Sequence, residues 1–404
     1  MRPLDNPYTP NAGAEPLAVV GRDDQLASFD LLLARLQRGR TEQSMIITGL
    51  RGVGKTVLLG QFREKALAQS WVVVELEVSK SDESQFRREL ATKLRSALFQ
   101  LSPKARWTDR FEHAAAVLRS FTVSVDSTGA LSAGLDVDAA AGFADHDDLA
   151  LDLTDVFLAL GEAAKDRETG LVLLFDEVQF FNQAQLEALI QALHKMVQRK
   201  LPITLVGAGL PQIAELAGDA KSYAERLFKF PKIGNLSPDD AKQALLRPAQ
   251  GEGASYTAEA LEAAVEITSG YPYFLQELGS AVWTIADGPT ITREDVEMAV
   301  PGYEAKLDES FFRVRLDRAS TLQSSYLRAM AGLGPTAQKA SDVADAVGRT
   351  SQNLAPIRAE LISMGLLYTP EHGYAAFTVP QFDKFMLRAI PTLTVPDKRR
   401  NPRR

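Results

Sequence analysis

The sequence contains no cysteine. This absence excludes disulfides, thiolate zinc sites and cysteine nucleophiles, and it suits the reducing cytosol. The chain also has no run of 18 or more apolar residues, so we expect no transmembrane helix. Residues 1–7 lack the apolar core of a secretory signal. We therefore expect a cytoplasmic protein that makes no membrane contact.

Positive charge is scarce except at one end of the chain. The net charge is −7, but residues 321–404 sum to +5 and residues 1–320 to −12. Most of the positive excess lies in residues 398–404, where five of the seven residues are Lys or Arg. The asymmetry predicts an acidic catalytic part and a basic contact end. A disordered, solvated tail is the alternative interpretation.

The first 234 residues alternate between strand-like and helical patterns. Residues 171–175 form a continuous apolar run, which is typical of a strand buried on both faces of a parallel sheet. The alternation predicts an α/β fold with a parallel sheet. The expected strands are residues 44–48, 71–78, 171–175 and 202–206, and the expected helices include residues 23–38, 57–68 and 81–100.

The rest of the chain predicts further domains, because 404 residues exceed one compact core. We expect a core over residues 1–234, which begins with an extended arm. A helical segment should follow over residues 235–318, then a small unit over 319–390 and a basic tail over 391–404. Within the core, residues 120–148 show a hairpin pattern in a surface insertion, in which Val123 and Val125, then Leu131, Leu135 and Val137, alternate with small or polar residues.

Residues 49–56 have the spacing Gly-x-x-x-x-Gly-Lys-Thr, and they lie between an expected strand and an expected helix. Glycines let backbone N–H groups turn inward around phosphates, and the following helix adds its positive N-terminal end. Lys55 would reach the β- and γ-phosphates, and the Thr56 hydroxyl would ligate Mg²⁺. A structural glycine turn is the alternative. The predicted ATP-binding residues here are Gly49, Gly52, Gly54, Lys55, Thr56 and Val57.

An acidic pair, Asp176 and Glu177, ends the apolar run of residues 171–175. A carboxylate at the end of a buried strand is costly unless a cation meets it. Mg²⁺ held through water by Asp176 would meet that need, and Glu177 would then polarise the attacking water. A helix N-cap is the alternative role for the pair.

Four motifs together resemble the AAA+ and STAND-type P-loop ATPases. They are GLRGVGKT at residues 49–56, LLFDE at 173–177, VGRD at 20–23 and GYPYFLQ at 270–276. Within that group the chain looks most like the origin-recognition and cell-division-cycle initiator branch and its bacterial relatives, over residues 16–390. The resemblance implies a P-loop NTPase αβα core of five strands, a helical lid, a C-terminal winged helix, and ATP with Mg²⁺. It also implies that Gly21, Arg22 and Pro272 lie on the adenine side.

The resemblance extends to one arginine and fails at two other places. Arg226 stands where this family often carries an arginine finger, which would reach the γ-phosphate of a neighbouring subunit; a surface arginine is the alternative. The family's polar sensor residue is missing from residues 207–211, and its lid arginine is missing from residues 269–283. These departures favour a slowly hydrolysing nucleotide switch over a motor.

Residues 319–390 read as three helices followed by a two-stranded hairpin, which resembles a winged helix-turn-helix. In that fold the third helix enters the major groove of DNA. Pro356 should lie in the first turn of this helix. The expected DNA contacts are exposed polar residues of the third helix, Gln352, Asn353 and Arg358, together with Lys398, Arg399 and Arg400 of the tail.

Two function hypotheses follow from these patterns. The first is an ATP-dependent switch that binds double-stranded DNA through the winged helix and forms homo-oligomers through Arg226. The second is a STAND-type signalling ATPase whose winged helix contacts a protein partner. A metabolic kinase is disfavoured, because the sequence shows no pattern for binding an acceptor substrate. A kinase would also have no use for a winged helix.

Overall fold

The computed structural model describes residues 1–396 except residues 12, 103–107 and 124–134. The chain divides into two compact units. The sheet unit comprises Gly21–Gly49 and Gly54–Ile233, and the helical unit comprises Met1–Val20, Leu50–Val53 and Gly234–Arg404. Among the described residues, no helix is both long and apolar enough to cross a membrane.

The sheet unit is built on five parallel strands in the order β2-β3-β4-β1-β5. This result confirms the predicted parallel α/β fold. Every residue of the central strands β1 and β4 is buried, whereas the edge strand β2 alternates between buried and exposed residues. The strands are β1 (Ser44–Thr48), β2 (Val72–Glu77), β3 (Leu171–Asp176), β4 (Ile203–Gly209) and β5 (Phe228–Lys229).

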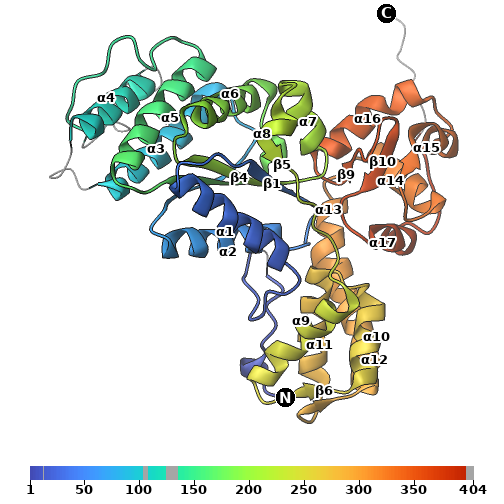
Figure 1. The fold of residues 1–404 in the computed structure, drawn as a ribbon. Helices are drawn as coiled ribbons and strands as arrows, with labels where there is room; N and C mark the ends of the chain where they lie inside the picture. The colour runs from blue at the N-terminus through green and yellow to red at the C-terminus, as the bar shows by residue number, and fades with distance from the viewer. Residues whose placement is uncertain (12, 103–107, 124–134, 397–404) are drawn as a thin grey trace, which may run out of the picture. The chain divides into compact units, whose positions relative to one another are not determined.

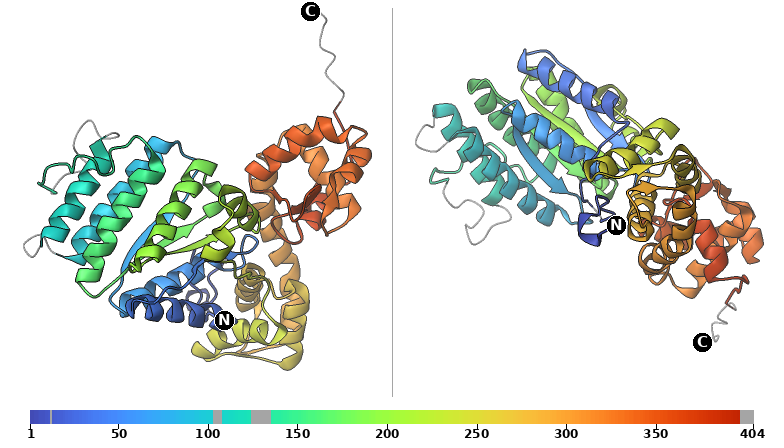
Figure 2. Two further views of the ribbon diagram at one scale, coloured as in Figure 1. Left: turned by 45° about the horizontal axis from the view of Figure 1, so that its top comes forward. Right: turned by 90° about the horizontal axis from the view of Figure 1, so that it is seen from below.

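Helices cover both faces of this sheet (Figure 1). On one face lie α1 (Asp23–Gln37) and α2 (Lys55–Ala68). On the other lie α3 (Glu83–Leu101), α5 (Leu149–Asp166) and α6 (Gln183–Arg199), and α4 (Asp109–Val123) packs against α3 and α5. Figure 2 shows α3, α4 and α5 side by side. The short helices α7 (Ile213–Ala220) and α8 (Ala224–Leu227) precede β5.

The predicted hairpin within residues 120–148 is wrong at both of its described ends. Val123 is the last residue of α4, and neither Leu135 nor Val137 lies in a strand. The rest of that hairpin, residues 124–134, lies outside the described residues. Leu135 and Ala144 are buried in the core of the unit, whereas most other residues from 136 to 148 are exposed. The local alternation misled because the apolar spacing before Val123 is helical, with Phe111, Ala114, Ala115, Leu118 and Phe121 buried.

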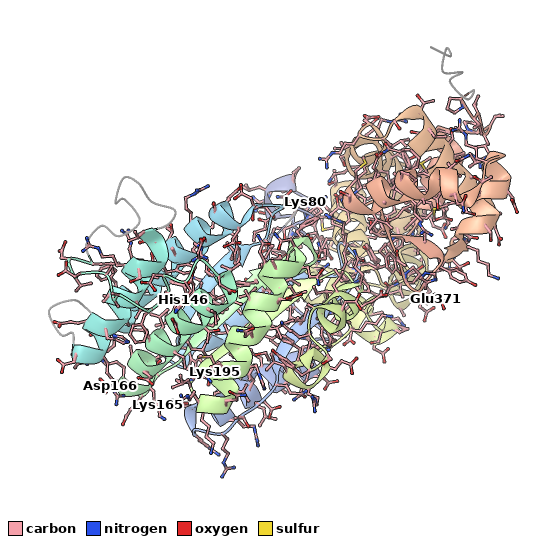
Figure 3. The ribbon with its side chains drawn as sticks, turned by 90° about the horizontal axis from the view of Figure 1, so that it is seen from above. Lys80, His146, Lys165, Asp166, Lys195 and Glu371 are labelled. Atoms are coloured by element: carbon pink, nitrogen blue, oxygen red, sulfur yellow. The ribbon has the colours of Figure 1, made fainter. Side chains whose placement is uncertain are left out.

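A buried ion pair joins α3 to α5. The Arg87 Nη1 atom lies 2.7 Å from Asp152 Oδ2, and both side chains are almost fully buried. The Arg87 guanidinium also stacks over the Phe121 ring of α4. Asp152 accepts a further hydrogen bond from the backbone N–H of His146 at 2.9 Å, and the His146 ring lies 3.1 Å away. That side-chain hydrogen bond raises the pKa of His146. Figure 3 labels His146, which precedes α5, and Asp166, which ends it.

The helical unit begins with four helices and an N-terminal arm. The Tyr8 hydroxyl in the arm donates to the Leu245 carbonyl at 2.6 Å. Gly279 leaves room for the Tyr8 ring, since a Cβ there would lie 2.7 Å from it. The two-stranded parallel sheet β6 (Ser255–Tyr256) with β7 (Thr290–Ile291) departs from the purely helical prediction. The helices are α9 (Pro238–Gly251), α10 (Ala258–Thr268), α11 (Pro272–Ile285) and α12 (Arg293–Lys306), and the arm includes η1 (Pro3–Asp5).

A π-helical segment, η4 (Leu307–Arg313), and α13 (Val314–Leu316) lead into the C-terminal part. Four helices and a three-stranded antiparallel sheet, in the order β8-β10-β9, follow. The elements are α14 (Thr321–Leu333), β8 (Gln338–Lys339), α15 (Ala340–Val347), α16 (Ser351–Ser363), β9 (Leu367–Tyr368), β10 (Tyr374–Phe377) and α17 (Phe382–Ala389).

The placement of Pro356 in the first turn of the third helix is wrong. The Thr350 hydroxyl accepts the backbone N–H of Asn353 and so caps α16, which begins at Ser351. Pro356 is therefore the sixth residue of the helix, where it has no N–H to donate to the Gln352 carbonyl.

Candidate nucleotide-binding site

The glycine-rich loop of residues 49–56 connects β1 to α2. Gly52 and Gly54 have φ values of 80° and 92°, in the left-handed region that favours glycine. The Gly49 N–H donates to the Gly209 carbonyl at 3.1 Å, which ties the loop to the end of β4. Lys55 begins α2, is buried, and donates from Nζ to the Gly49 carbonyl at 3.1 Å. The loop thus holds an ammonium group at the N-terminus of a helix, which suits phosphate.

Thr56 and Asp176 meet at the end of β3. The Thr56 hydroxyl donates to Asp176 Oδ2 at 2.6 Å. Burial raises the pKa of Asp176, although hydrogen bonds from Thr56 and from the Glu177 N–H at 2.8 Å oppose this rise. The Thr56 hydroxyl and the Asp176 carboxylate are oxygen ligands of the kind that hard divalent cations prefer. A bound cation would also compensate the negative charge of Asp176, which burial disfavours. The pair therefore fits Mg²⁺, as expected for a P-loop site.

Glu177 follows directly, with a left-handed φ of 54° that is rare for a residue with a side chain. Its carboxylate accepts a hydrogen bond from the Gln179 carboxamide, which lies in η3 (Val178–Phe180). The Gln179 Oε1 atom accepts the backbone N–H of Leu210 at 3.0 Å. Sequence analysis missed Gln179, and the signal for it was an amide side chain two residues after the acidic pair.

The tip of the loop, Leu50–Val53, belongs to the helical unit. At the start of α11, the Tyr273 N–H donates to the Gly52 carbonyl at 3.2 Å. A Cβ on Gly52 would lie 3.1 Å from the Tyr271 hydroxyl oxygen and 3.2 Å from Tyr273 Cβ. Gly52 therefore meets two needs, a left-handed backbone and close approach of α11.

Arg51 contacts the C-terminal part of the same unit. Its N–H donates to the Thr378 carbonyl at 3.2 Å. Its guanidinium packs against Gly365, where a Cβ would lie 2.6 Å from Nη2. The residues that precede and follow the β9–β10 hairpin thus contact the tip of the phosphate loop.

The residues expected on the adenine side fall in different units. Gly21 has a left-handed φ of 66°, and Arg22, which donates to the Gly21 carbonyl at 3.0 Å, precedes α1 in the sheet unit. Pro272 is the first residue of α11 in the helical unit. Gly270, two residues earlier, has a packing reason to be glycine, because a Cβ would lie 2.7 Å from the Leu236 carbonyl oxygen.

The remaining predicted residues lie elsewhere. Arg226 is exposed on α8, and Gln352 and Asn353 are exposed on α16. Val57 is half-buried in the first turn of α2. Lys398, Arg399 and Arg400 lie outside the described residues.

The expectation that Arg358 is exposed is wrong. Arg358 is half-buried, and its Nη1 atom is fully buried. Burial raises the pKa of Tyr326 in α14, and the positive charge of Arg358 opposes that rise. The helix that carries Arg358, α16, packs against α14, which accounts for this partial burial.

Residues 18–206 match the family model described as the AAA ATPase domain. These residues are therefore similar to an AAA ATPase domain. The phosphate loop, Asp176 and Glu177 all fall within the matched part of the chain. Residues 309–386 match a second family model, a domain of unknown function named DUF8462, which spans η4 to α17.

One solved structure shares the fold of most of the chain. A Walker-type ATPase of Pyrococcus abyssi is 17% identical, with a TM-score of 0.56 over 91% of this chain and 96% of that one, which shows a shared fold. The RuvB Holliday junction branch migration motor of Thermotoga maritima is 15% identical, with a TM-score of 0.46 over 93% and 96%. Cdc6p of Pyrobaculum aerophilum is 14% identical, with a TM-score of 0.44 over 95% and 97%. No curated protein sequence matches the chain.

Lys55→Ala should weaken ATP binding by about 2–3 kcal/mol, or roughly 30- to 160-fold, because a buried charged donor to the phosphates is lost. Isothermal titration calorimetry with Mg–ATP measures this change. Lys65→Ala is the control, since Lys65 lies on the same helix but pairs with Asp30 at 2.7 Å. Wild-type affinity in Lys55→Ala would contradict the site.

Proposed function

We propose that the protein is an ATP-dependent switch that slowly hydrolyses ATP and binds double-stranded DNA through its C-terminal part. The observation that carries the ATPase half is the 2.6 Å hydrogen bond between Thr56 and Asp176, with Glu177 next in the chain. In this proposal, Thr56 and Asp176 form the cation site and Glu177 is the base, at the end of β3.

The chain's own groups have distinct tasks in hydrolysis. Mg²⁺, when bound, neutralises phosphate charge, and the Thr56 and Asp176 oxygens hold it. The Lys55 ammonium group, which donates to the Gly49 carbonyl in this structure, would donate to phosphate oxygens when ATP is bound. The Glu177 carboxylate accepts a proton from the water whose oxygen attacks the γ-phosphorus, as the bond from that phosphorus to the ADP oxygen breaks. Gly21, Arg22 and Pro272 are our proposed contacts for the base.

A switch requires that nucleotide binding change the structure outside the phosphate site. The contacts of Arg51 with Gly365 and Thr378, and of Gly52 with Tyr271 and Tyr273, support this requirement. A shift of the loop tip on nucleotide binding would disturb both sets of contacts. Arg226 is exposed, as a group that acts on a neighbouring subunit must be, and we propose it for that role.

DNA binding is supported by the order of elements after residue 320. Three helices with an antiparallel sheet follow the order of a winged helix-turn-helix, and Gln352 and Asn353 are exposed on the third helix. The five basic residues of the tail add positive charge beside this unit in the sequence. A role in protein contact is the second candidate, since the unit is neutral without its tail.

DNA binding should weaken steeply with salt, with a log–log slope of about 0.9 per phosphate contact. Replacing the five basic residues of 398–404 with glutamine should flatten this slope for all sequences alike. Gln352→Ala with Asn353→Ala should instead change the preference among sequences. Gel shifts over a series of salt concentrations, with ATP present, measure both effects.

The control for the tail is the pair Arg199→Gln and Lys200→Gln, which removes exposed charge at the end of α6 in the sheet unit. If ATP-loaded wild-type protein binds no duplex at low salt, the protein-contact role replaces DNA binding.

A further inference from the structure

We propose that Gln179 is a positioning residue for ATP hydrolysis: its carboxamide fixes the Glu177 carboxylate between the ends of β3 and β4. The inference rests on the proposed ATPase function and adds a residue to it. Glu177 directly follows β3, and Gln179 lies two residues later, in η3.

Both ends of the Gln179 carboxamide are engaged. Its Nε2 donates to Glu177 Oε2, and its Oε1 accepts the backbone N–H of Leu210 at 3.0 Å. The orientation of the amide follows from its partners, because an N–H requires an acceptor and a carboxylate requires a donor. A rotated amide would lose both hydrogen bonds. Gln179 therefore links the Glu177 carboxylate to the Leu210 backbone, and its carboxamide can do so in only one orientation.

The end of β4 is shaped to admit this bridge. A Cβ on Gly209 would lie 2.8 Å from Gln179 Oε1 and 2.8 Å from Val178 Cγ2, and a Cβ on Gly207 would lie 3.1 Å from Val178 Cγ1. Neither glycine is among the residues with positive φ, so backbone freedom does not explain them. Close approach of η3 does. The polar group that residues 207–211 lack in their own side chains is thus supplied by Gln179.

The Glu177 carboxylate needs a hydrogen-bond partner to hold it in one position, because its local structure alone would let it move. Its left-handed backbone turns the chain sharply after β3, and its side chain is half-buried with several rotatable bonds. The neighbouring carboxylate, Asp176, is held by Thr56 and by the Glu177 N–H. Fixing the second carboxylate completes a rigid pair. A misplacement of about 1 Å in such a group costs on the order of 100-fold in rate.

Another glutamine in the same region provides a matched control. Gln183 Nε2 donates to Glu187 Oε1 at 2.9 Å on the exposed side of α6. The pair has the same chemistry as Gln179 with Glu177, but Glu187 has no part in the site. Replacing Gln183 therefore shows what the loss of a glutamine–glutamate hydrogen bond does when it lies outside the proposed site.

The experiment compares Gln179→Leu with Gln183→Leu in the full-length protein. Gln179→Leu keeps the approximate volume and removes both hydrogen bonds. We expect kcat for ATP hydrolysis to fall by roughly 10- to 100-fold, with the dissociation constant for ATP within about twofold of wild type. Gln183→Leu should change neither quantity. Thermal unfolding of each variant verifies that it is folded.

A pH profile separates positioning from packing. Gln179→Glu keeps the shape but sets a second carboxylate against Glu177. Two adjacent carboxylates share a proton to higher pH, so the acidic limb of the kcat profile should move upward. A side chain that only packs would change the height of the profile and not the position of its limb.

The outcomes are distinguishable. The inference is overturned if kcat of Gln179→Leu stays within threefold of Gln183→Leu, or if ATP affinity falls as far as kcat. An unmoved acidic limb in Gln179→Glu also counts against it. If wild-type protein and Glu177→Gln hydrolyse ATP at the same rate, the proposed function is wrong, and the inference fails with it.

Discussion

Glu177→Gln should lower the rate of ATP hydrolysis by about 10²- to 10⁴-fold, the usual contribution of a positioned general base. ATP affinity should stay within about twofold, because Lys55, Thr56 and Asp176 remain in place. The glutamine can still accept a hydrogen bond from Gln179, so the local structure is preserved and only the basic charge is lost. Phosphate release under saturating ATP measures turnover, and calorimetry measures binding.

Glu187→Gln is the control for this change, since Glu187 is a half-exposed carboxylate on α6 that also accepts a glutamine hydrogen bond. Its turnover should equal that of wild type. If Glu177→Gln releases phosphate as fast as Glu187→Gln does, Glu177 is not the base, and the proposed hydrolysis mechanism is wrong.

Asp152→Leu should lower the free energy of unfolding by about 3–5 kcal/mol, because it leaves the buried Arg87 charge without its closest carboxylate. The other ion pair of Arg87 is with Glu83 at 3.1 Å, and Glu83 is half exposed, so it compensates weakly. The backbone N–H of His146 also loses its acceptor. Urea unfolding followed by circular dichroism measures the loss.

Asp166→Leu is the control at the other end of α5. Asp166 makes an exposed ion pair with Arg110 at 3.7 Å, a type worth about 0–1 kcal/mol. The double variant Arg87→Met with Asp152→Leu should recover most of the stability, because it removes the buried charge together with its partner. A double variant as unstable as Asp152→Leu alone would show that packing, rather than an unpaired charge, sets the loss.

Much of the sheet unit could be predicted because its signals are local. The strand of residues 44–48 has the predicted bounds, since an apolar run meets a glycine-rich loop at one end and polar residues at the other. The proximity of Thr56 and Asp176, 120 positions apart, followed from two motifs at the ends of parallel strands. A parallel sheet brings such ends to one edge, whatever the sequence between them.

Other features depend on contacts that no local pattern carries. Gln179 gains a role because Gly207 and Gly209 admit η3 against β4, and neither glycine belongs to a known motif. Val123 was assigned to a strand because alternation over a few residues also fits the end of a buried helix. Arg358 was expected on the surface from its type alone, whereas its partial burial depends on how α16 packs against α14.

The N-terminal arm has a consequence for the timing of synthesis. Tyr8 hydrogen-bonds to the Tyr256 hydroxyl at 2.9 Å across 248 positions of the chain. At about 5–20 residues per second, a ribosome needs roughly 12–50 s to make the intervening chain. During that interval the arm has left the ribosome, but the helices that bury Tyr8 do not yet exist. The arm is thus made well before the helices that it contacts, and the helical unit can pack completely only after the sheet unit has been synthesised.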